Sequence, residues 1–360
     1  MKFAFYSIIF LLISKYSFSQ DHKTENLIVV VLDGMRWQEV FTGADSVLMN
    51  NAVFTKDKET VIKRFWDNDV NIRRKKLFPF LWGTIAQQGQ LYGNRLAGCK
   101  VNVSNPFQLT YPGFSEMLTG YADPAIRSNR SVISQSDNVL EFINGQEGFK
   151  GKVAVFATSD LFPYLLNRAK SKLYINADTD TFSFTGSSFT LLNKMQQLSY
   201  KPTTERPDLL TYFDAIEYCK IYRPRVLYLA LGETDAFAHA GNYDQYLETA
   251  FAEDRMIKEL WQMIQSLPQY KNKTAIIITC DHGRGDSIKE QWTKHGPDIK
   301  DSGEIWIAAM GPGIQVKGEV HIAPQLYQAQ LAATMAGILG YDFKPGTHQA
   351  FPVIEELAGK

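Results

Sequence analysis

Two Asp/His pairs and one further histidine stand out in the second half of the sequence. Asp235 and His239 are four residues apart, Asp281 and His282 are adjacent, and His295 follows further along. A four-residue separation places two side chains on one face of a helix, where an Asp/His pair either grips a metal ion or forms an ordinary ion pair. Because mixed carboxylate and imidazole ligands suit zinc better than calcium or magnesium, the pattern predicts a zinc-type site.

One of these pairs, and one further aspartate, come directly after short apolar runs. Asp33 follows the run 27–32, and Asp281 with His282 follows the run 275–280. In an open parallel sheet the ligand site lies beyond the carboxyl ends of the strands, so these side chains are expected to meet there. A turn or helix-capping aspartate is the other interpretation of Asp33.

A threonine stands at the expected start of a helix in the segment 110–113, which reads Thr-Tyr-Pro-Gly. Proline is favoured in the first turn of a helix, so Pro112 indicates that the helix begins just after Thr110. A helix N-terminus offers free amides and a positive dipole end, which stabilise a phosphate or an alkoxide. Thr110 is therefore a candidate nucleophile, with a plain helix-capping threonine as the alternative.

Short apolar, β-branched segments alternate along the chain with helix-like stretches. Strands are predicted at 27–32, 152–157, 226–231, 274–280 and 305–310. Helices are predicted at 77–88, 114–118, 243–265 and 323–339. Strands that are buried on both faces of a parallel sheet are apolar throughout, and alternation of strand and helix is typical of α/β proteins. The sequence therefore predicts an α/β fold, a mostly parallel central sheet with helices on both faces.

One domain is expected from residue 20 to residue 360, because no internal repeat or low-complexity linker divides the chain. The segment 44–76 is polar, shows no strong period and carries the basic cluster 73–76. It is predicted to be a solvated loop or a small cap inserted into the domain. A single short run of basic residues is not typical of a nucleic-acid-binding patch.

The first nineteen residues resemble an export signal. Lys2 precedes the apolar run 3–13, and the small residues Ser17 and Ser19 suit cleavage before Gln20. The run is short for a membrane span, although a buried N-terminal helix or a membrane anchor is the alternative. The mature protein is therefore expected in the periplasm or outside the cell.

The overall charge and the cysteines exclude several classes of function. The 38 basic residues balance the 38 acidic ones, so no global field draws the protein to nucleic acid or to an anionic membrane. Three cysteines are too few for a disulfide scaffold, and no Cys-x-x-Cys spacing indicates a thiolate zinc site. The cysteines are expected to be packing residues.

The order of these motifs resembles the alkaline phosphatase superfamily, and within it the nucleotide pyrophosphatase/phosphodiesterase branch. Asp-Gly after the first strand, Thr-Tyr-Pro-Gly before a helix, Asp-x-x-x-His, Asp-His-Gly and a later His-Gly follow one another as in that branch. The similarity spans about residues 27 to 315, and only the short motifs are specific. It implies an alkaline phosphatase-like fold.

The resemblance also implies two bound divalent metal ions, which are expected to be Zn²⁺. The ligands of one ion would be Asp235, His239 and His295. The ligands of the other ion would be Asp33, Asp281 and His282.

Thr110 becomes, under this resemblance, the nucleophile bound to the second ion, and its attack forms a covalent phospho-threonine. An asparagine beyond the nucleophile holds a phosphate oxygen in this branch, and Asn129 is the nearest candidate, with a surface turn residue as the alternative. Four basic side chains near the motifs either clamp a phosphate oxygen or are solvated surface charges. They are Arg127, Arg130, Arg284 and Lys294.

The function that this resemblance implies is that of an exported two-metal hydrolase of phosphate esters, either a phosphodiesterase or a phosphomonoesterase. Its substrate is expected to be a small phosphate ester and not a nucleic-acid polymer. The alternatives are a phosphonate hydrolase or sulfatase-like enzyme of the same superfamily, or a catalytically silent member that only binds. The sulfatase branch uses cysteine or serine in a Cys/Ser-x-Pro-x-Arg motif, so Thr110 at that position disfavours sulfatase chemistry.

Overall fold

A computed structural model describes residues 24–201, 205–346, 348 and 350–359. The main sheet has eight strands in the order β10-β2-β9-β7-β1-β6-β4-β5. β9 is antiparallel to both of its neighbours, and the other neighbouring strands pair in parallel. In chain order the strands are β1 (Asn26–Leu32), β2 (Gly89–Tyr92), β4 (Val153–Ala157), β5 (Tyr174–Ala177), β6 (Val226–Leu231), β7 (Thr274–Thr279), β9 (Ile307–Met310) and β10 (Gly318–Glu319).

The three central strands β6, β1 and β7 are buried along their whole length. Their apolar, mostly branched side chains can pack on both faces of the sheet, which is why they read as continuous apolar runs. The register brings their carboxyl ends level, because Leu32 pairs with Leu231 and Val31 pairs with Thr279. Polar residues that follow these strands therefore gather at one edge of the sheet.

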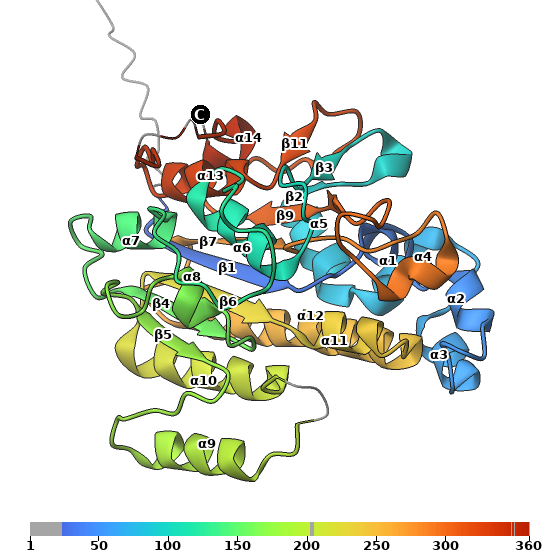
Figure 1. The fold of residues 1–360 in the computed structure, drawn as a ribbon, viewed down its shortest axis with the longest axis horizontal. Helices are drawn as coiled ribbons and strands as arrows, with labels where there is room; N and C mark the ends of the chain where they lie inside the picture. Colours follow the sequence, from blue (N-terminus) through green and yellow to red (C-terminus); the bar gives the residue numbers. More distant parts are fainter. Residues whose placement is uncertain (1–23, 202–204, 347, 349, 360) are drawn as a thin grey trace, which may run out of the picture.

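Helices cover both faces of this sheet (Figure 1). α6 (Thr110–Thr119) contacts α7 (Val139–Asn144), α8 (Phe162–Leu165) and α13 (Gln330–Ile338), and Figure 1 shows α6 and α13 above β1. α10 (Asp208–Tyr222) packs against β4 and β6, and it lies with α12 (Tyr243–Ser266) below the strands in the same view. The predicted α/β fold with a mostly parallel sheet is confirmed.

Further helical segments and a second, three-stranded sheet complete the described fold. Among these helical segments are α1 (Trp37–Thr42), η2 (Arg95–Ala97), α9 (Ser187–Leu198), α11 (Glu233–His239), η3 (Lys289–Thr293) and α14 (Glu355–Ala358). The second sheet has the order β11 (Leu326–Tyr327), β3 (Val101–Asn102) and β8 (Glu304–Ile305). Strands were correctly predicted at β1, β4, β6 and β7, whereas the segment 305–310 divides between β8 and β9.

The helix predictions need three corrections. The predicted helix 323–339 begins only at Gln330, because Leu326 and Tyr327 form a short strand, β11, that pairs with β3. The stretch 77–88 forms a π-helix, η1 (Leu81–Ile85), that continues into the short α5 (Ala86–Gln88). The helix expected at 114–118 starts four residues earlier, with Thr110 as its first residue.

The segment 44–76 is helical, so the solvated-loop interpretation is wrong, and the alternative, a small cap, stays a prediction. It contains α2 (Ser46–Asn50), α3 (Lys58–Phe65) and α4 (Val70–Leu77), which pack against α12. Each helix follows an aspartate whose side chain accepts hydrogen bonds from the first-turn amides, and these aspartates are Asp45, Asp57 and Asp69. Helices of five to eight residues are too short to show a hydrophobic period, which is why the sequence pattern missed them.

All three cysteines, Cys99, Cys219 and Cys280, are buried and unpaired, as expected for packing residues. In the part of the chain that the structure describes, no helix combines the length and the apolar character needed to cross a membrane. The predicted export signal, residues 1–19, lies outside the described residues.

Candidate metal centre

The central strands deliver their polar residues to one edge of the sheet. Asp33 directly follows β1, and Asp281 with His282 lies just beyond β7. Gly232 alone separates β6 from α11, the helix that carries Asp235 near its start. Because the strands end level, the structure brings these groups together as the sequence predicted.

Two glycines allow the chain segments to approach closely at this edge. Gly34 has a φ of 58°, and a Cβ atom there would lie 2.7 Å from Asp235 Oδ1 and 2.9 Å from a side-chain nitrogen of Arg284. A Cβ atom on Gly113, in α6, would overlap the carbonyl oxygen of Asp281. Residues without a side chain are therefore required at both positions for α6 and the strand ends to meet.

The first group of candidate ligands is Asp33, Asp281 and His282, all of them buried. His282 Nε2 lies 3.3 Å from Asp33 Oδ1 and 3.5 Å from Asp281 Oδ2. One ligand atom from each residue lies within 4.8 Å of the others, a spacing that can hold a metal ion. Asp33 Oδ1 and Asp281 Oδ2 are buried and accept no hydrogen bond within the described chain, so both oxygens lack a partner.

The second group is formed by Asp235, His239 and His295, as predicted. His239 Nε2 lies 3.2 Å from Asp235 Oδ2 and 3.0 Å from His295 Nε2. His239 stands at the end of α11 with 47% of its side chain exposed. His282 also faces this group, and it forms a second potential ion-holding set with Asp235 and His295. His282 therefore lies between the two groups, which the motif order alone did not indicate.

The imidazoles are oriented by backbone carbonyls on their other nitrogen. His282 Nδ1 lies 2.9 Å from the carbonyl oxygen of Gly283, and His295 Nδ1 lies 3.0 Å from that of Gln108. An Nδ1–H group that donates to a carbonyl leaves Nε2 as the free ligand atom, an arrangement common around metal sites. Burial, and after it the nearby His282, lowers the pKa of His295 to about 2, so this ring stays neutral.

The carboxylates of the site differ in their electrostatic surroundings. Burial raises the pKa of Asp33 and of Asp281 well above the usual range, and the charge of a neighbouring aspartate adds to that effect. The pKa of Asp235 lies well below its usual range despite burial, chiefly because the Arg284 guanidinium stabilises the charged form. Crowded carboxylates with raised pKa values indicate that the site lacks positive charge.

Arg284 is a part of the site whose role the sequence left open. Its guanidinium is buried, pairs with Asp235 through Nη1 and donates to the carbonyl oxygens of Trp292 and Thr293, at 2.8 and 2.7 Å. The sequence left open whether Arg284 clamps phosphate or is a surface charge, and the structure shows neither arrangement. Its position two residues after His282 was the only available signal.

Thr110 is the first residue of α6, and Leu109 occupies the capping position without a side-chain bond. The Thr110 hydroxyl does not cap the helix. Its Oγ1 lies 3.4 Å from His282 Nε2, so it faces the candidate ligands. The first turn of α6 offers few free amides, because the Tyr111 N–H donates to Asn129 Oδ1 at 2.9 Å and Pro112 has no N–H.

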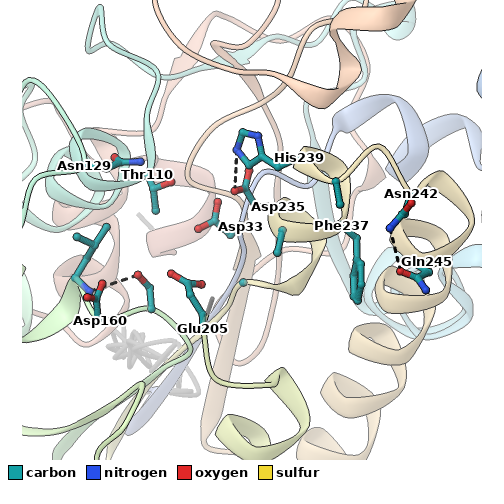
Figure 2. Close-up of a pocket in the computed structure, with 15 residues that line it drawn as sticks. Asp33, Thr110, Asn129, Asp160, Glu205, Asp235, Phe237, His239, Asn242 and Gln245 are labelled. Carbon is teal, nitrogen blue, oxygen red and sulfur yellow. Dashed lines mark hydrogen bonds and ion pairs between the residues drawn. The ribbon is translucent and has the colours of Figure 1, made fainter. Parts of the chain in front are cut away.

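A cavity of about 660 Å³ opens over these groups. Figure 2 shows Thr110 and Asn129 together on one side of Asp33 and Asp235, with Phe237 on the other side. The residues of the described chain that line this cavity include no lysine and no arginine. The predicted basic residues Arg127, Arg130 and Lys294 are thus not among its walls.

A comparison with known protein families agrees with the motif order of the sequence. Residues 41–356 match the model of the family Type I phosphodiesterase / nucleotide pyrophosphatase. The comparison with curated proteins gives no match.

Several solved structures share the fold at low sequence identity. The alkaline phosphatase PafA has a TM-score of 0.64 and 10% identity over 94% of this chain and 99% of its own. A 2-O GAG sulfatase has a TM-score of 0.61 and 12% identity over 94% of this chain and 75% of its own. The lipoteichoic acid synthase LtaP from Listeria monocytogenes has a TM-score of 0.57 and 13% identity over 94% of this chain and 76% of its own.

Structures so distant in sequence show only the fold, whereas the family model covers most of the chain. The motif order, the parallel sheet and the family match agree with one another. The chain belongs to the Type I phosphodiesterase / nucleotide pyrophosphatase family.

Proposed function

We propose that this protein is an exported, metal-dependent phosphodiesterase in which Thr110 is the nucleophile. The observation that carries the proposal is the position of the Thr110 hydroxyl, which does not cap its helix but lies 3.4 Å from His282 Nε2. That hydroxyl lines the same cavity as Asp33 and Asp235. A hydroxyl beside carboxylate and imidazole ligands is the arrangement that covalent phosphate chemistry requires.

The acidic and imidazole side chains fit two divalent ions. Two buried aspartate oxygens lack partners, and two imidazoles present Nε2 while carbonyl groups hold Nδ1. When bound, the ions supply Lewis-acid stabilisation of the phosphate and leaving oxygens, and mixed oxygen and nitrogen ligands favour Zn²⁺. Asp33, Asp281 and His282 would hold one ion. Asp235, His239 and His295 would hold the other, since His239 Nε2 lies beside both Asp235 and His295.

The reaction proceeds in two displacements at phosphorus. Thr110 Oγ1 forms a bond to phosphorus while the bond to the ester's leaving oxygen breaks, which gives phospho-Thr110 and a free alcohol. Water then attacks the phosphorus, the bond to Thr110 Oγ1 breaks, and the remaining phosphate monoester is released. The proton of the attacking water returns to the threonine oxygen.

Asn129 holds a phosphate oxygen in this proposal. Its Oδ1 accepts the Tyr111 N–H at 2.9 Å, which fixes the orientation of the amide group. The amide nitrogen, with two N–H donors, is then free to face the cavity beside Thr110, as Figure 2 shows. Asn129 thus replaces the helix amides that the first turn of α6 does not offer.

The charge of the cavity favours a diester over a monoester. A phosphodiester carries one negative charge at neutral pH, whereas a monoester carries nearly two. Two additional carboxylates, Asp160 and Glu205, line the cavity, and among the described residues no lysine or arginine does. These wall residues therefore do not stabilise the second charge of a monoester.

The experiment that tests this proposal compares Thr110→Ala with the parent after zinc reconstitution, on a methyl p-nitrophenyl phosphate diester. We expect turnover to fall by about 10³-fold or more, with metal content near two equivalents in both proteins. Thr110→Ser should keep part of the activity. A folded, metal-loaded Thr110→Ala that hydrolyses the diester within a few-fold of the parent would replace the covalent route with direct attack by water.

Export is a separate part of the proposal and rests on the sequence 1–19. The mature chain is expected to begin near Gln20 in the extracytoplasmic fraction. Mass spectrometry of the N-terminus after expression in the native host tests it. An intact Met1 on a cytoplasmic protein contradicts it.

A further inference from the structure

The cavity over the candidate metal centre has one acidic side that the proposed reaction does not use. Asp160 lies in the turn between β4 and α8, and Glu205 lies three residues before α10. Both side chains line the cavity, and Figure 2 places them together on the side of Thr110, away from Phe237. We call these two carboxylates the acidic wall.

The acidic wall lies close to the reacting groups. A Cβ atom on Gly232, which also lines the cavity, would lie 2.8 Å from Glu205 Oε2. Gly232 is the residue between β6 and α11, three positions before Asp235. Thr110, Gly232 and Glu205 line one cavity, so a substituent on a phosphate held at Thr110 shares that cavity with Glu205.

The charges of the wall and of the metal centre act on one another. Burial, and after it the negative charges of Asp235, Asp208 and Asp160, raise the pKa of Glu205 to about 7, while a hydrogen bond from Ser159 opposes the rise. The carboxylates of Asp160 and Glu205 therefore lie close enough for their charges to interact.

The opposite side of the cavity is neutral. Phe237, Asn242 and Gln245 form it, and they lie beyond Asp235 when viewed from Thr110 (Figure 2). In-line displacement places the leaving group on the side of phosphorus opposite to the nucleophile. The neutral side thus faces the leaving group, and the acidic wall faces the substituent that stays on phosphorus.

We infer that the retained substituent of the substrate carries a positive charge, an ammonium group held by Asp160 and Glu205. This inference rests on the proposed phosphodiesterase function and names the substrate class of the same site. Such a substrate is a zwitterionic diester, whose phosphate meets the metal centre and whose ammonium group meets the wall. A diester with further negative charge meets only repulsion there.

The test uses two p-nitrophenyl phosphodiesters that share their leaving group. One carries choline as the second substituent, and the other carries 3,3-dimethylbutanol, an uncharged group of the same shape. At low ionic strength we expect the zinc-loaded parent to show kcat/KM about 10-fold higher for the choline ester, the size of a close charge pair near water. An ethanolamine ester shows whether a primary ammonium serves equally well.

Two variants assign the preference to the wall. Asp160→Asn and Glu205→Gln should each reduce the ratio of the two kcat/KM values to about 3 or less. Asp160 is exposed in its turn, so this variant keeps the test informative if the change at Glu205 impairs folding. Glu259→Gln is the matched control, because it removes one exposed carboxylate of α12 that does not line the cavity, and it should keep the parent's ratio.

The outcomes separate this inference from the function on which it rests. Equal kcat/KM values for the two esters would overturn the inference and leave the phosphodiesterase function intact. A ratio that stays near 10 in both wall variants would also overturn it. If the zinc-loaded parent hydrolyses neither ester, the proposed function itself is wrong, and the inference falls with it.

Discussion

Two groups of three carboxylates lie side by side in this molecule, and they compensate their charge by different means. In the metal centre, Asp33, Asp235 and Asp281 stand next to imidazoles, and two of their oxygens lack partners. The second group, which we call the closed acid group, has one carboxylate from each of α10, α11 and α12. Its members are Asp208, Glu233 and Glu253.

Two members of the closed acid group, Asp208 and Glu233, bond to backbone N–H groups, whereas both carboxylate oxygens of Glu253 are buried without a hydrogen-bond partner in the described chain. Asp208 accepts hydrogen bonds from the backbone N–H groups of Gly232 and Glu233, at 2.8 and 2.9 Å, and from the Thr158 hydroxyl. Glu233 Oε2 accepts the Asp208 N–H at 2.9 Å, so α10 and α11 cap one another. Burial, and after it Asp208, raises the pKa of Glu253 well above its usual range, so Glu253 keeps its proton.

The comparison shows what distinguishes a carboxylate group that needs a cation from one that does not. Backbone amides and a retained proton compensate the closed acid group, and no imidazole among the described residues is hydrogen-bonded to it. Unpaired carboxylate oxygens occur in both groups, but only the metal centre adds imidazole nitrogens and opens onto the cavity. Ligand chemistry and access, more than the number of acidic residues, decide which group binds metal.

The largest effect is expected from His282→Ala, because His282 faces both ligand groups. Metal content should fall from about two equivalents to one or fewer, and kcat/KM should fall by about 10³-fold or more. Elemental analysis and diesterase kinetics measure the two quantities. His239→Ala, at the half-exposed position, should lose less of both, and equal losses in the two variants would contradict the central place of His282.

A smaller effect is expected from Arg284→Met, which removes the buried cation beside Asp235. The metal-free protein should lose about 3 kcal/mol of unfolding free energy, since the change leaves a buried carboxylate and two carbonyl groups without their partner. Urea denaturation measures the loss. It should be smaller in the zinc-loaded protein, where the ion compensates Asp235, and an equal loss in both forms would separate Arg284 from the metal centre.

Asp208→Asn should cost about 2 kcal/mol, because the amide oxygen can accept from only one of the two helix-capping N–H groups and its NH₂ group opposes the other. Thermal unfolding at neutral pH gives the measurement. Metal content should stay at the parent value. Loss of bound zinc in this variant would show that the closed acid group and the metal centre act as one unit.

The smallest effect is expected from Glu253→Gln, which imitates the protonated acid. The folded-state pKa of Glu253 is raised, so between the unfolded value near 4.5 and the higher folded value the folded form holds a proton that the unfolded form has lost. The parent therefore loses stability as the pH rises through this window, and the variant does not. Unfolding free energies should agree within about 0.5 kcal/mol at pH 4.5 and diverge in favour of the variant toward pH 8.

Residues that follow apolar runs in the sequence could be placed without the structure. Asp33, Asp281 and His282 come directly after strands, and parallel strands bring such positions to one edge. Thr110 was found from the proline two residues later, although its helix begins at Thr110 itself.

Other parts of the site depend on burial and on contacts between distant segments, which residue types do not reveal. Arg284 looks like any surface arginine until its burial is known. Asp160 and Glu205 are 45 positions apart and follow different secondary-structure elements, so no local pattern joins them. The helices in 44–76 were missed because each has only five to eight residues, too few to show a repeating apolar pattern.

The glycines beneath the metal centre limit how the sequence of this site can evolve. Gly34 and Gly113 leave less than the width of one methyl group between the segments they join, so almost any mutation there disrupts the ligand geometry. The cavity walls, in contrast, come from turns and helix ends whose side chains point into open space. New substrate preferences can therefore evolve through substitutions at positions such as Asp160 and Phe237, while the floor that performs the chemistry stays fixed.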